Sequence, residues 1–375
     1  MVLPRTVATL RLAEVLSSCL RAVHGHQNPL SLAPVSKAAV VLIDGLGAAP
    51  LESRRGHARW LTEKWRQRGL VADSGFPSTT ASALASLTTG VDPGEHGIVG
   101  YTVRDPASGA LINHLKEWEP HVHPDSWQRT PTLFEQAAGH GIPSLSMGER
   151  RFEGTGFTRA VWRGAEFVGT DSLADQFQRV RDFFDSHERG LAYLYWPALD
   201  RTGHSSGVAS DAWIRRLEDL DSQLQELDSL LGPDEGIVIT ADHGMVDVRD
   251  EDKLMVVEDS ALLHSVVAWG GEPRAVQLYL DNPGSREAVM VAWSTAVGDG
   301  AVVLSKEQAM DAGLFGRVAP EVESRIGDVL VLATGPVAFY RSEVASSQSM
   351  KMVGQHGSIT PEEREIPVIP VGAWG

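Results

Sequence analysis

Acidic and imidazole side chains stand within a few residues after the ends of three short apolar runs of the chain. Asp44 follows the run AAVVLI, Asp200 and His204 follow LAYLYW within DRTGH, and Asp242 and His243 follow GIVIT. Carboxylate oxygens and imidazole nitrogens are ligands that proteins offer to zinc, manganese and iron. Each residue alone has an ordinary explanation, such as a helix cap or a surface imidazole. Their recurrence after three separate runs predicts a shared metal site.

Hydroxyl side chains before an alanine-rich stretch offer a candidate nucleophile. Residues 76–80 read FPSTT and lead into ASALASLTTG. That stretch predicts a helix, which places Thr79 or Thr80 near its N-terminus. There the free backbone N–H groups and the helix dipole favour an anion, such as an alkoxide or a phosphoryl oxygen. Ordinary capping by serine or threonine is the alternative that this segment alone leaves open.

Continuous apolar strands predict the frame that brings these groups together. Residues 38–43, 191–196 and 236–240 are apolar without alternation, as in strands that are buried on both faces. Apolar positions from Trp213 to Leu231 predict a helix between the last two strands. The expected fold class is α/β, with a mostly parallel central sheet covered by helices on both faces. Ligands bind beyond the carboxyl ends of such strands, where all three polar segments lie.

The pattern of apolar and polar residues changes from residue 272 onward. Residues 275–280, 286–297 and 301–304 read as strand, helix and strand. This pattern predicts a small α+β subdomain at 272–334. The subdomain would be inserted into a catalytic α/β domain formed by residues 1–271 and 335–375.

The N-terminal segment predicts an amphipathic helix rather than a secretory signal. Its apolar positions are interrupted by Arg11 and Glu14, and they are Val7, Leu10, Leu12, Val15 and Leu16. No uncharged apolar run is long enough for a membrane span. We therefore expect a cytoplasmic protein without a membrane span.

Charge and cysteine content narrow the classes of partner. The chain has 33 Lys and Arg residues against 49 Asp and Glu residues, a formal net charge of −16. Such a surface repels a nucleic acid polymer, whereas a small anionic substrate can bind beside a metal ion. The single cysteine, Cys19, excludes a disulfide within the chain and a cysteine-rich zinc site.

Four blocks together resemble the alkaline phosphatase superfamily, and most closely its type I phosphodiesterase/nucleotide pyrophosphatase branch. The blocks are IDGLG at Asp44, FPSTT through TTGVDPGEHGI, DRTGH with TADHGM, and GQHGS at His356. Their order and spacing agree with those of that family. The resemblance implies an alkaline phosphatase-like fold and a metal-dependent hydrolase of small phosphoesters, of the phosphodiesterase/nucleotide pyrophosphatase type.

The resemblance also implies a role for each residue. One metal ion would be held by Asp200, His204 and His356, and a second by Asp44, Asp242, His243 and Thr80. Thr80 rather than Thr79 aligns with the nucleophile when residues 89–97 are matched without a gap. The mixed ligands suit two Zn²⁺ ions, with Mn²⁺ or iron as alternatives. Thr80 would attack phosphorus, and water would then hydrolyse the phosphothreonine.

Three alternatives stay open at the level of the sequence. A phosphomonoesterase or phosphonate hydrolase would use the same scaffold, but a monoester dianion requires extra positive charge and no arginine stands beside Thr80. Ala83 offers no polar group to hold a phosphoryl oxygen, so Ser82 or a helix amide would have to do so. The second alternative is that neither does, and that the chain is a metal-stabilised binding protein without turnover. The third alternative is a nicotinamide dehydrogenase, because residues 45–50, GLGAAP, imitate the start of a dinucleotide motif, but Pro50 replaces the third glycine of that motif.

Overall fold

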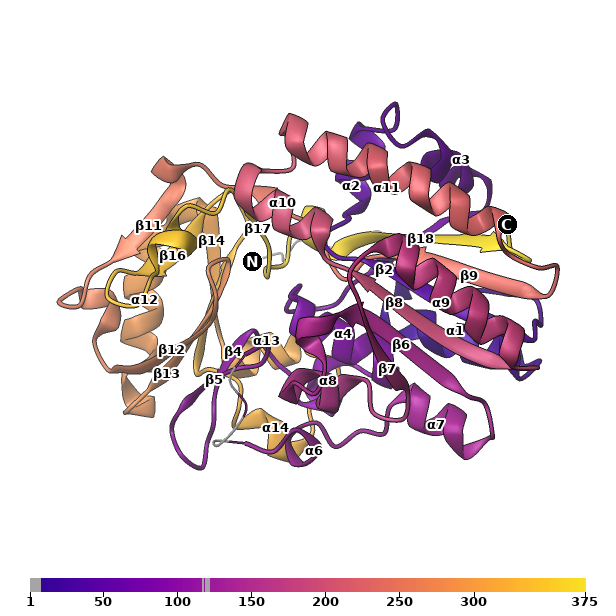
Figure 1. Ribbon diagram of the computed structural model, residues 1–375. Coiled ribbons are helices and arrows are strands. Elements are labelled where there is room, and N and C mark those ends of the chain that lie inside the picture. Colours follow the sequence, from indigo (N-terminus) through magenta and orange to yellow (C-terminus); the bar gives the residue numbers. More distant parts are fainter. Residues whose placement is uncertain (1–7, 117, 119–121) are drawn as a thin grey trace.

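A large sheet and a smaller sheet lie side by side in the computed structural model, which describes residues 8–116, 118 and 122–375 (Figure 1). The large sheet has the strand order β1 (Leu10–Arg11), β3 (Leu70–Asp73), β18 (Glu365–Gly372), β9 (Glu235–Thr240), β2 (Lys37–Ile43), β8 (Gly190–Trp196), β6 (Ser144–Glu149) and β7 (Glu166–Thr170). Only β18 runs antiparallel to its neighbours within this sheet. The mostly parallel sheet expected from the sequence is confirmed.

The three apolar runs form adjacent strands at the centre of this sheet. β2 pairs with β8 on one side and with β9 on the other, both in parallel. Ile43 lies opposite Trp196, and Leu42 lies opposite Thr240. Because the strands are parallel and in this register, the segments that follow them leave the sheet at one edge.

Helices cover both faces of the large sheet, as an apolar strand run without alternation requires. One face carries α1 (Ala13–Val23), α4 (Thr80–Thr89), α7 (Leu133–Gly139) and α8 (Gly156–Val161). The other carries α2 (Ala48–Ser53), α3 (Arg59–Arg68), α9 (Leu173–Ser186) and α11 (Asp211–Ser229). α11 is the helix expected before Gly232; its Ser210 hydroxyl accepts the Trp213 N–H at 3.2 Å, and its apolar stripe is buried.

The predicted N-terminal helix was wrong over its first residues. Leu10–Arg11 forms β1, which pairs in parallel with β3 at the edge of the sheet, and the helix begins only at Ala13. The Glu14 carboxylate accepts the backbone N–H of Arg11 at 2.8 Å. Pairing with β3 satisfies backbone groups that a helix over residues 10–11 would leave exposed at the sheet edge. Val7 lies outside the described residues.

The smaller sheet is antiparallel and has its own apolar core. Its order is β12 (Val266–Glu272), β13 (Ala275–Leu280), β15 (Val329–Ala333) and β14 (Ala301–Ser305), and α12 (Arg286–Val297) packs against it. The segment 272–334 does not contain the whole of this sheet, because β12 precedes Glu272. The domain boundaries therefore stay a prediction.

The remaining strands and helices are short. They are the pairs β4 (Thr102–Arg104) with β5 (Leu111–Asn113), β10 (Val246–Asp247) with β17 (Gly354–Gln355) and β11 (Lys253–Val256) with β16 (Ala338–Arg341), and the helices α5 (Pro93–His96), α6 (Pro124–Trp127), α10 (Ala198–Ser206), α13 (Lys306–Asp311), α14 (Pro320–Glu323), α15 (Ser347–Met350) and α16 (Pro361–Arg364). Among the residues that the structure describes, no helix combines the length and apolarity needed to cross a membrane.

Candidate metal centre and active site

The ends of β2, β8 and β9 place the predicted carboxylates and two of the predicted imidazoles together. Asp44 directly follows β2, and Asp242 and His243 come two and three residues after the last residue of β9. Asp200 and His204 lie in α10 after β8, and their spacing of four residues puts them on one face of that helix. Asp200 Oδ1 is 3.4 Å from His204 Nε2, and Asp44 Oδ1 is 3.4 Å from His243 Nε2.

His356 reaches this cluster from a loop after β17, far along the chain. Its Nε2 is 4.0 Å from Asp200 Oδ1, and its ring stacks on that of His243 with centroids 3.6 Å apart. The backbone of the loop pairs with the segment before α4, where Ser78 N–H donates to Gly357 O at 3.2 Å. This pairing brings the His356 loop next to the candidate nucleophile.

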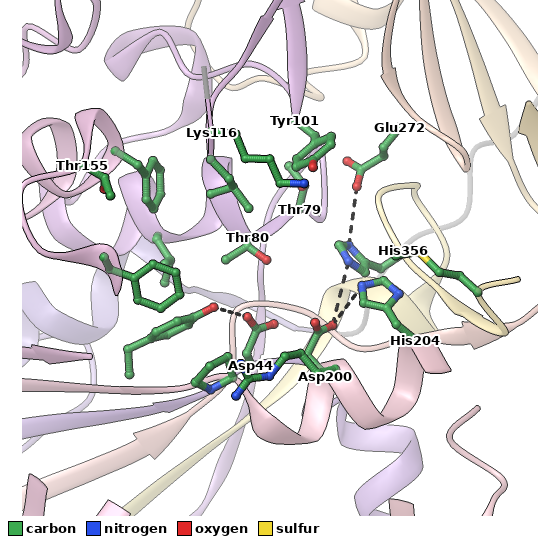
Figure 2. Close-up of a pocket in the computed structure, with 18 of the residues that line it drawn as sticks. Asp44, Thr79, Thr80, Tyr101, Lys116, Thr155, Asp200, His204, Glu272 and His356 are labelled. Atoms are coloured by element: carbon green, nitrogen blue, oxygen red, sulfur yellow. Dashed lines mark hydrogen bonds and ion pairs between the residues drawn. The ribbon is translucent and has the colours of Figure 1, made fainter. Parts of the chain in front are cut away.

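Thr80 is the first residue of α4 and lies inside the cluster. Its Oγ1 is 3.2 Å from His243 Nε2, and the residue is 8% exposed. Figure 2 shows its hydroxyl on the side facing Asp44 and Asp200. All seven residues singled out in the sequence therefore meet in one place.

Each of the three histidines is oriented by a main-chain carbonyl. Nδ1 lies 2.8 Å from Gly354 O in His204, 3.1 Å from Gly244 O in His243 and 2.9 Å from Ser78 O in His356. A carbonyl oxygen only accepts hydrogen bonds, so Nδ1 carries the proton in each ring. The Nε2 lone pairs are thus directed at the cluster, as in histidines that bind metal ions.

Three carboxylate oxygens in the cluster are buried without a hydrogen-bond partner among the described residues: Asp44 Oδ1, Asp200 Oδ1 and Asp242 Oδ2. In two of these carboxylates the opposite oxygen accepts a hydrogen bond: Asp44 Oδ2 from the Tyr195 hydroxyl, and Asp242 Oδ1 from Gly45 N–H at 3.2 Å. Burial, together with the neighbouring carboxylates, raises the pKa of Asp44 well above its usual range, and burial also raises that of Asp242. Divalent cations would offset this crowding of negative charge.

Two overlapping sets of ligand atoms could hold metal ions. One is Asp200, His204 and His356, and the other is Asp44, Asp200 and His243, with the atoms of each set within 4.8 Å of one another. Asp200 is thus common to both sets. Asp242, predicted for the second set, has Oδ2 3.5 Å from His243 Nε2. The orphaned oxygens and the oriented Nε2 atoms fit metal ions, and carboxylate with imidazole suits zinc.

A cavity of about 480 Å³ opens beside the cluster and is lined by residues that the sequence analysis missed. They include Tyr195, Glu272, Lys116, Arg151 and Arg201, with the aromatic side chains of Phe152, Phe157 and Trp162. Tyr195 could have been found, because it stands one residue before the end of a strand already identified. Arg201 is also part of an identified block, DRTGH, whereas the others come from segments without a recognisable motif.

No arginine stands beside Thr80 in the sequence, but positively charged side chains from other segments line the cavity. Lys116, Arg151 and Arg201 all line the cavity, although none of them is close to Thr80 in the sequence. Both arginines pair with the single carboxylate of Glu149. Lys116 has no ion pair within the described part of the chain, and Figure 2 shows its ammonium group extending over the space near Thr79. Lys116 therefore brings to the cavity a positive charge that does not pair with a carboxylate of the described residues.

Ser82 cannot hold a phosphoryl oxygen in the way the sequence allowed. Its hydroxyl donates to Ile98 O at 2.7 Å, and the side chain is buried. Ala83 is also buried in the core. Thr79 makes no side-chain cap hydrogen bond to α4. The backbone amides of the first turn of α4 are the alternative donors that remain.

The chain matches a known protein family over most of its length. Residues 38–359 match the type I phosphodiesterase/nucleotide pyrophosphatase family. The chain belongs to that family. Membership confirms the resemblance seen in the sequence, and it supports the expected enzyme class, a hydrolase that acts on phosphoester bonds.

Solved structures of low sequence identity share the fold. An inactive threonine-to-alanine variant of murine ectonucleotide pyrophosphatase/phosphodiesterase 5, in complex with AMP, is 16% identical with a TM-score of 0.71; the match covers 90% of this chain and 88% of that one. Phosphonoacetate hydrolase from Sinorhizobium meliloti, in complex with phosphonoacetate, is 20% identical with a TM-score of 0.68, over 90% and 91%.

Curated relatives match only in part. A phosphopentomutase of Anaeromyxobacter dehalogenans is 32% identical over 117 residues, 30% of this chain and 28% of the relative. An uncharacterized pyrophosphatase/phosphodiesterase of Schizosaccharomyces pombe is 25% identical over 193 residues, 47% of this chain and 38% of the relative. The chain thus spans well under two thirds of the length of these relatives.

Proposed function

We propose that this chain hydrolyses small phosphodiesters or pyrophosphates through a phosphothreonine at Thr80, in a site that holds two divalent metal ions. The observation that carries the proposal is the position of the Thr80 hydroxyl, 3.2 Å from His243 Nε2 among buried carboxylates. The inactive threonine-to-alanine variant of the murine relative supports a threonine nucleophile in this fold. The cytoplasmic location stays a prediction.

The proposed reaction consists of two successive displacements at phosphorus. Thr80 Oγ1 loses its proton and forms a bond to phosphorus while the bond to the leaving oxygen breaks, and the leaving group takes up a proton and departs as an alcohol or a phosphate. Water then attacks the phosphothreonine, which releases the phosphoryl product and restores the hydroxyl. The free N–H groups at the start of α4 donate to a phosphoryl oxygen in both steps.

Metal ions would be held by the two sets of ligands described above. When bound, such ions lower the pKa of a hydroxyl or water and offset the charge of the phosphoryl oxygens. The chain's own contribution is to orient the ligands. Main-chain carbonyls fix the three imidazole rings, and the Tyr195 hydroxyl fixes one oxygen of Asp44. Zinc is the metal that we propose, with manganese or iron as alternatives.

Hydrolysis of bis-p-nitrophenyl phosphate and p-nitrophenyl phosphate, with and without added zinc or manganese, tests the proposed function. We expect metal-dependent release of nitrophenolate, with a higher kcat/KM for the diester. A fully metal-loaded sample that turns over neither compound would instead indicate a binding protein without turnover.

One observation favours a second candidate, a phosphomonoesterase or phosphonate hydrolase. Lys116 extends into the cavity without an ion pair in the described residues, and it could bind an additional anionic oxygen. Such a charged hydrogen bond contributes a factor of about ten to a hundred in affinity for the group it binds. The cavity thus supplies the extra charge that a monoester dianion needs.

Replacement of Lys116 distinguishes the two candidates. If a dianion is the natural substrate, Lys116→Ala lowers kcat/KM for the monoester by about tenfold or more and changes the diester much less. The exposed Lys351, which does not line the cavity, provides the matched control as Lys351→Ala. Equal losses on both substrates would remove the argument for the second candidate.

Loss of His356 should affect one metal ion more than the other. His356→Ala deletes a ligand of the set with Asp200 and His204 only, so we expect a protein that retains close to one metal ion per chain. Metal content is measured by atomic spectrometry after dialysis at limiting free metal. His140→Ala, at an exposed histidine, is the control. Wild-type stoichiometry in His356→Ala would contradict the proposed ligand.

A further inference from the structure

We infer that the turn between β12 and β13, residues 272–275, positions the loops that carry His243 and His356, with Arg274 as the central positioning residue. The smaller sheet would thereby maintain the geometry of the metal centre in the larger one. This inference rests on the proposed function, because it concerns the same site.

Arg274 and Glu363 form an ion pair that is completely buried. Arg274 Nε and Nη2 donate to the two carboxylate oxygens at 2.7 and 2.9 Å, and both side chains are 0% exposed. Arg274 Nη1 donates to Gly335 O and Val337 O at 2.8 and 2.9 Å. A planar guanidinium with all three nitrogens engaged has a single orientation, so it fixes the carboxylate in space.

Glu363 transmits this fixed position to both histidine loops. Its Oε1 accepts the Ser358 N–H at 2.9 Å, two residues after His356. Its main-chain carbonyl accepts the Gly244 N–H at 2.8 Å, directly after His243. A displacement of Glu363 would therefore move both loops at once.

Glu272, at the beginning of the same turn, contacts the His356 loop directly. Its Oε2 is 3.6 Å from His356 Nδ1 (Figure 2). A Cβ atom added to Gly357, which has φ +122°, would lie 2.4 Å from Glu272 Cδ. Such close packing leaves the loop no room to shift toward the turn.

Arg274 acts through other residues rather than on the substrate. It is completely buried and is not among the residues that line the cavity. Its removal should therefore change the order of the two loops and the affinity for metal, including in protein that contains neither metal nor substrate. That expectation separates positioning from catalysis.

Hydrogen–deuterium exchange of the metal-free full chain tests the inference. We expect Arg274→Met to accelerate exchange in peptides covering 242–246 and 355–360 by about tenfold or more, because the Gly244 and Ser358 amides lose a fixed acceptor. Affinity for zinc, measured by chelator competition, should fall by a similar factor. Arg274→Lys, which retains the charge without the two-point geometry, should be intermediate.

Arg181→Met is the matched control. Arg181 also binds a glutamate, Glu235, through two hydrogen bonds at 2.6 and 2.7 Å, but at the opposite end of β9 from His243. Loss of that pair should leave exchange at both loops and zinc affinity unchanged. Equal effects of Arg181→Met and Arg274→Met on the two loops would overturn the inference.

A double variant keeps the test decisive if Arg274→Met does not fold. Arg274→Met with Glu363→Leu removes both buried charges, a replacement that other proteins tolerate, and also removes the acceptor for Ser358 N–H. We expect a folded chain with fast exchange at 355–360; wild-type exchange and zinc affinity would overturn the inference. Because exchange is measured without substrate, absent hydrolysis would reject the proposed function and leave this result intact.

Discussion

Thr80→Ala should lower kcat/KM for bis-p-nitrophenyl phosphate by on the order of 10⁴-fold, because it removes the atom that we propose attacks phosphorus. Thr80 is the first residue of α4, and alanine is compatible with that position, so the fold should be retained. Metal content should stay at or near the wild-type value, since carboxylates and imidazoles remain. Thr80→Ser retains a hydroxyl and should recover part of the activity.

The neighbouring hydroxyl provides the sharpest comparison. Thr79→Val removes the hydroxyl one residue earlier and keeps a side chain of similar shape. We expect it to lower kcat/KM by no more than about tenfold. Thr88→Ala should leave turnover unchanged, because the Thr88 hydroxyl donates to Leu84 O and Ala85 O within α4. If the Thr79 variant were inactive and Thr80→Ala remained active, the nucleophile would be misassigned. Acid quenching followed by mass spectrometry should detect phosphate on the peptide that contains Thr80.

Removal of metal should abolish hydrolysis and also destabilise the fold. Without cations, Asp44, Asp200 and Asp242 bring buried carboxylate oxygens together with no hydrogen-bond partner among the described residues. Free metal at a thousand times its Kd adds about 4 kcal/mol to the free energy of unfolding for one site. We therefore expect the melting temperature to rise by at least about 5 °C when chelated protein is reloaded with zinc.

Calorimetry and turnover on the same samples check this prediction. Hydrolysis should return in proportion to the metal bound, and magnesium should restore less of it than zinc because imidazole ligands suit zinc. The Asp200→Asn variant, which alters the ligand common to both sets, should show a much smaller rise in melting temperature. Chelated protein that retains full turnover and an unchanged melting temperature would exclude the metal centre.

The framework of the site could be predicted from the sequence, because the arrangement of its residues follows from how the strands pack side by side. Three adjacent parallel strands end at one edge, so the residues that follow β2, β8 and β9 must converge there. The His356 block was placed by the family resemblance, and the Ser78–Gly357 pairing explains how it arrives. The apolar pattern of the strands was therefore sufficient to predict the positions of those site residues that the topology of the sheet determines.

Residues that depend on contacts between loops could not be predicted in this way. Lys116 and Arg151 line the cavity from segments whose position is set by tertiary packing. The partner of Ser82 is Ile98 O, which no spacing rule identifies. The two-residue strand β1 exists only because β3 offers a free edge, so helical periodicity around Leu10 was misleading.

The position of β18 has a consequence for synthesis on the ribosome. This strand, residues 365–372, lies between β3 and β9, although both of those are translated before it. A nascent chain that does not yet include residues 365–372 would hold two unpaired sheet edges, which are prone to association with other chains. The proposed hydrolytic activity should therefore emerge abruptly once β18 has been translated, and chaperone dependence should be greatest immediately before that point.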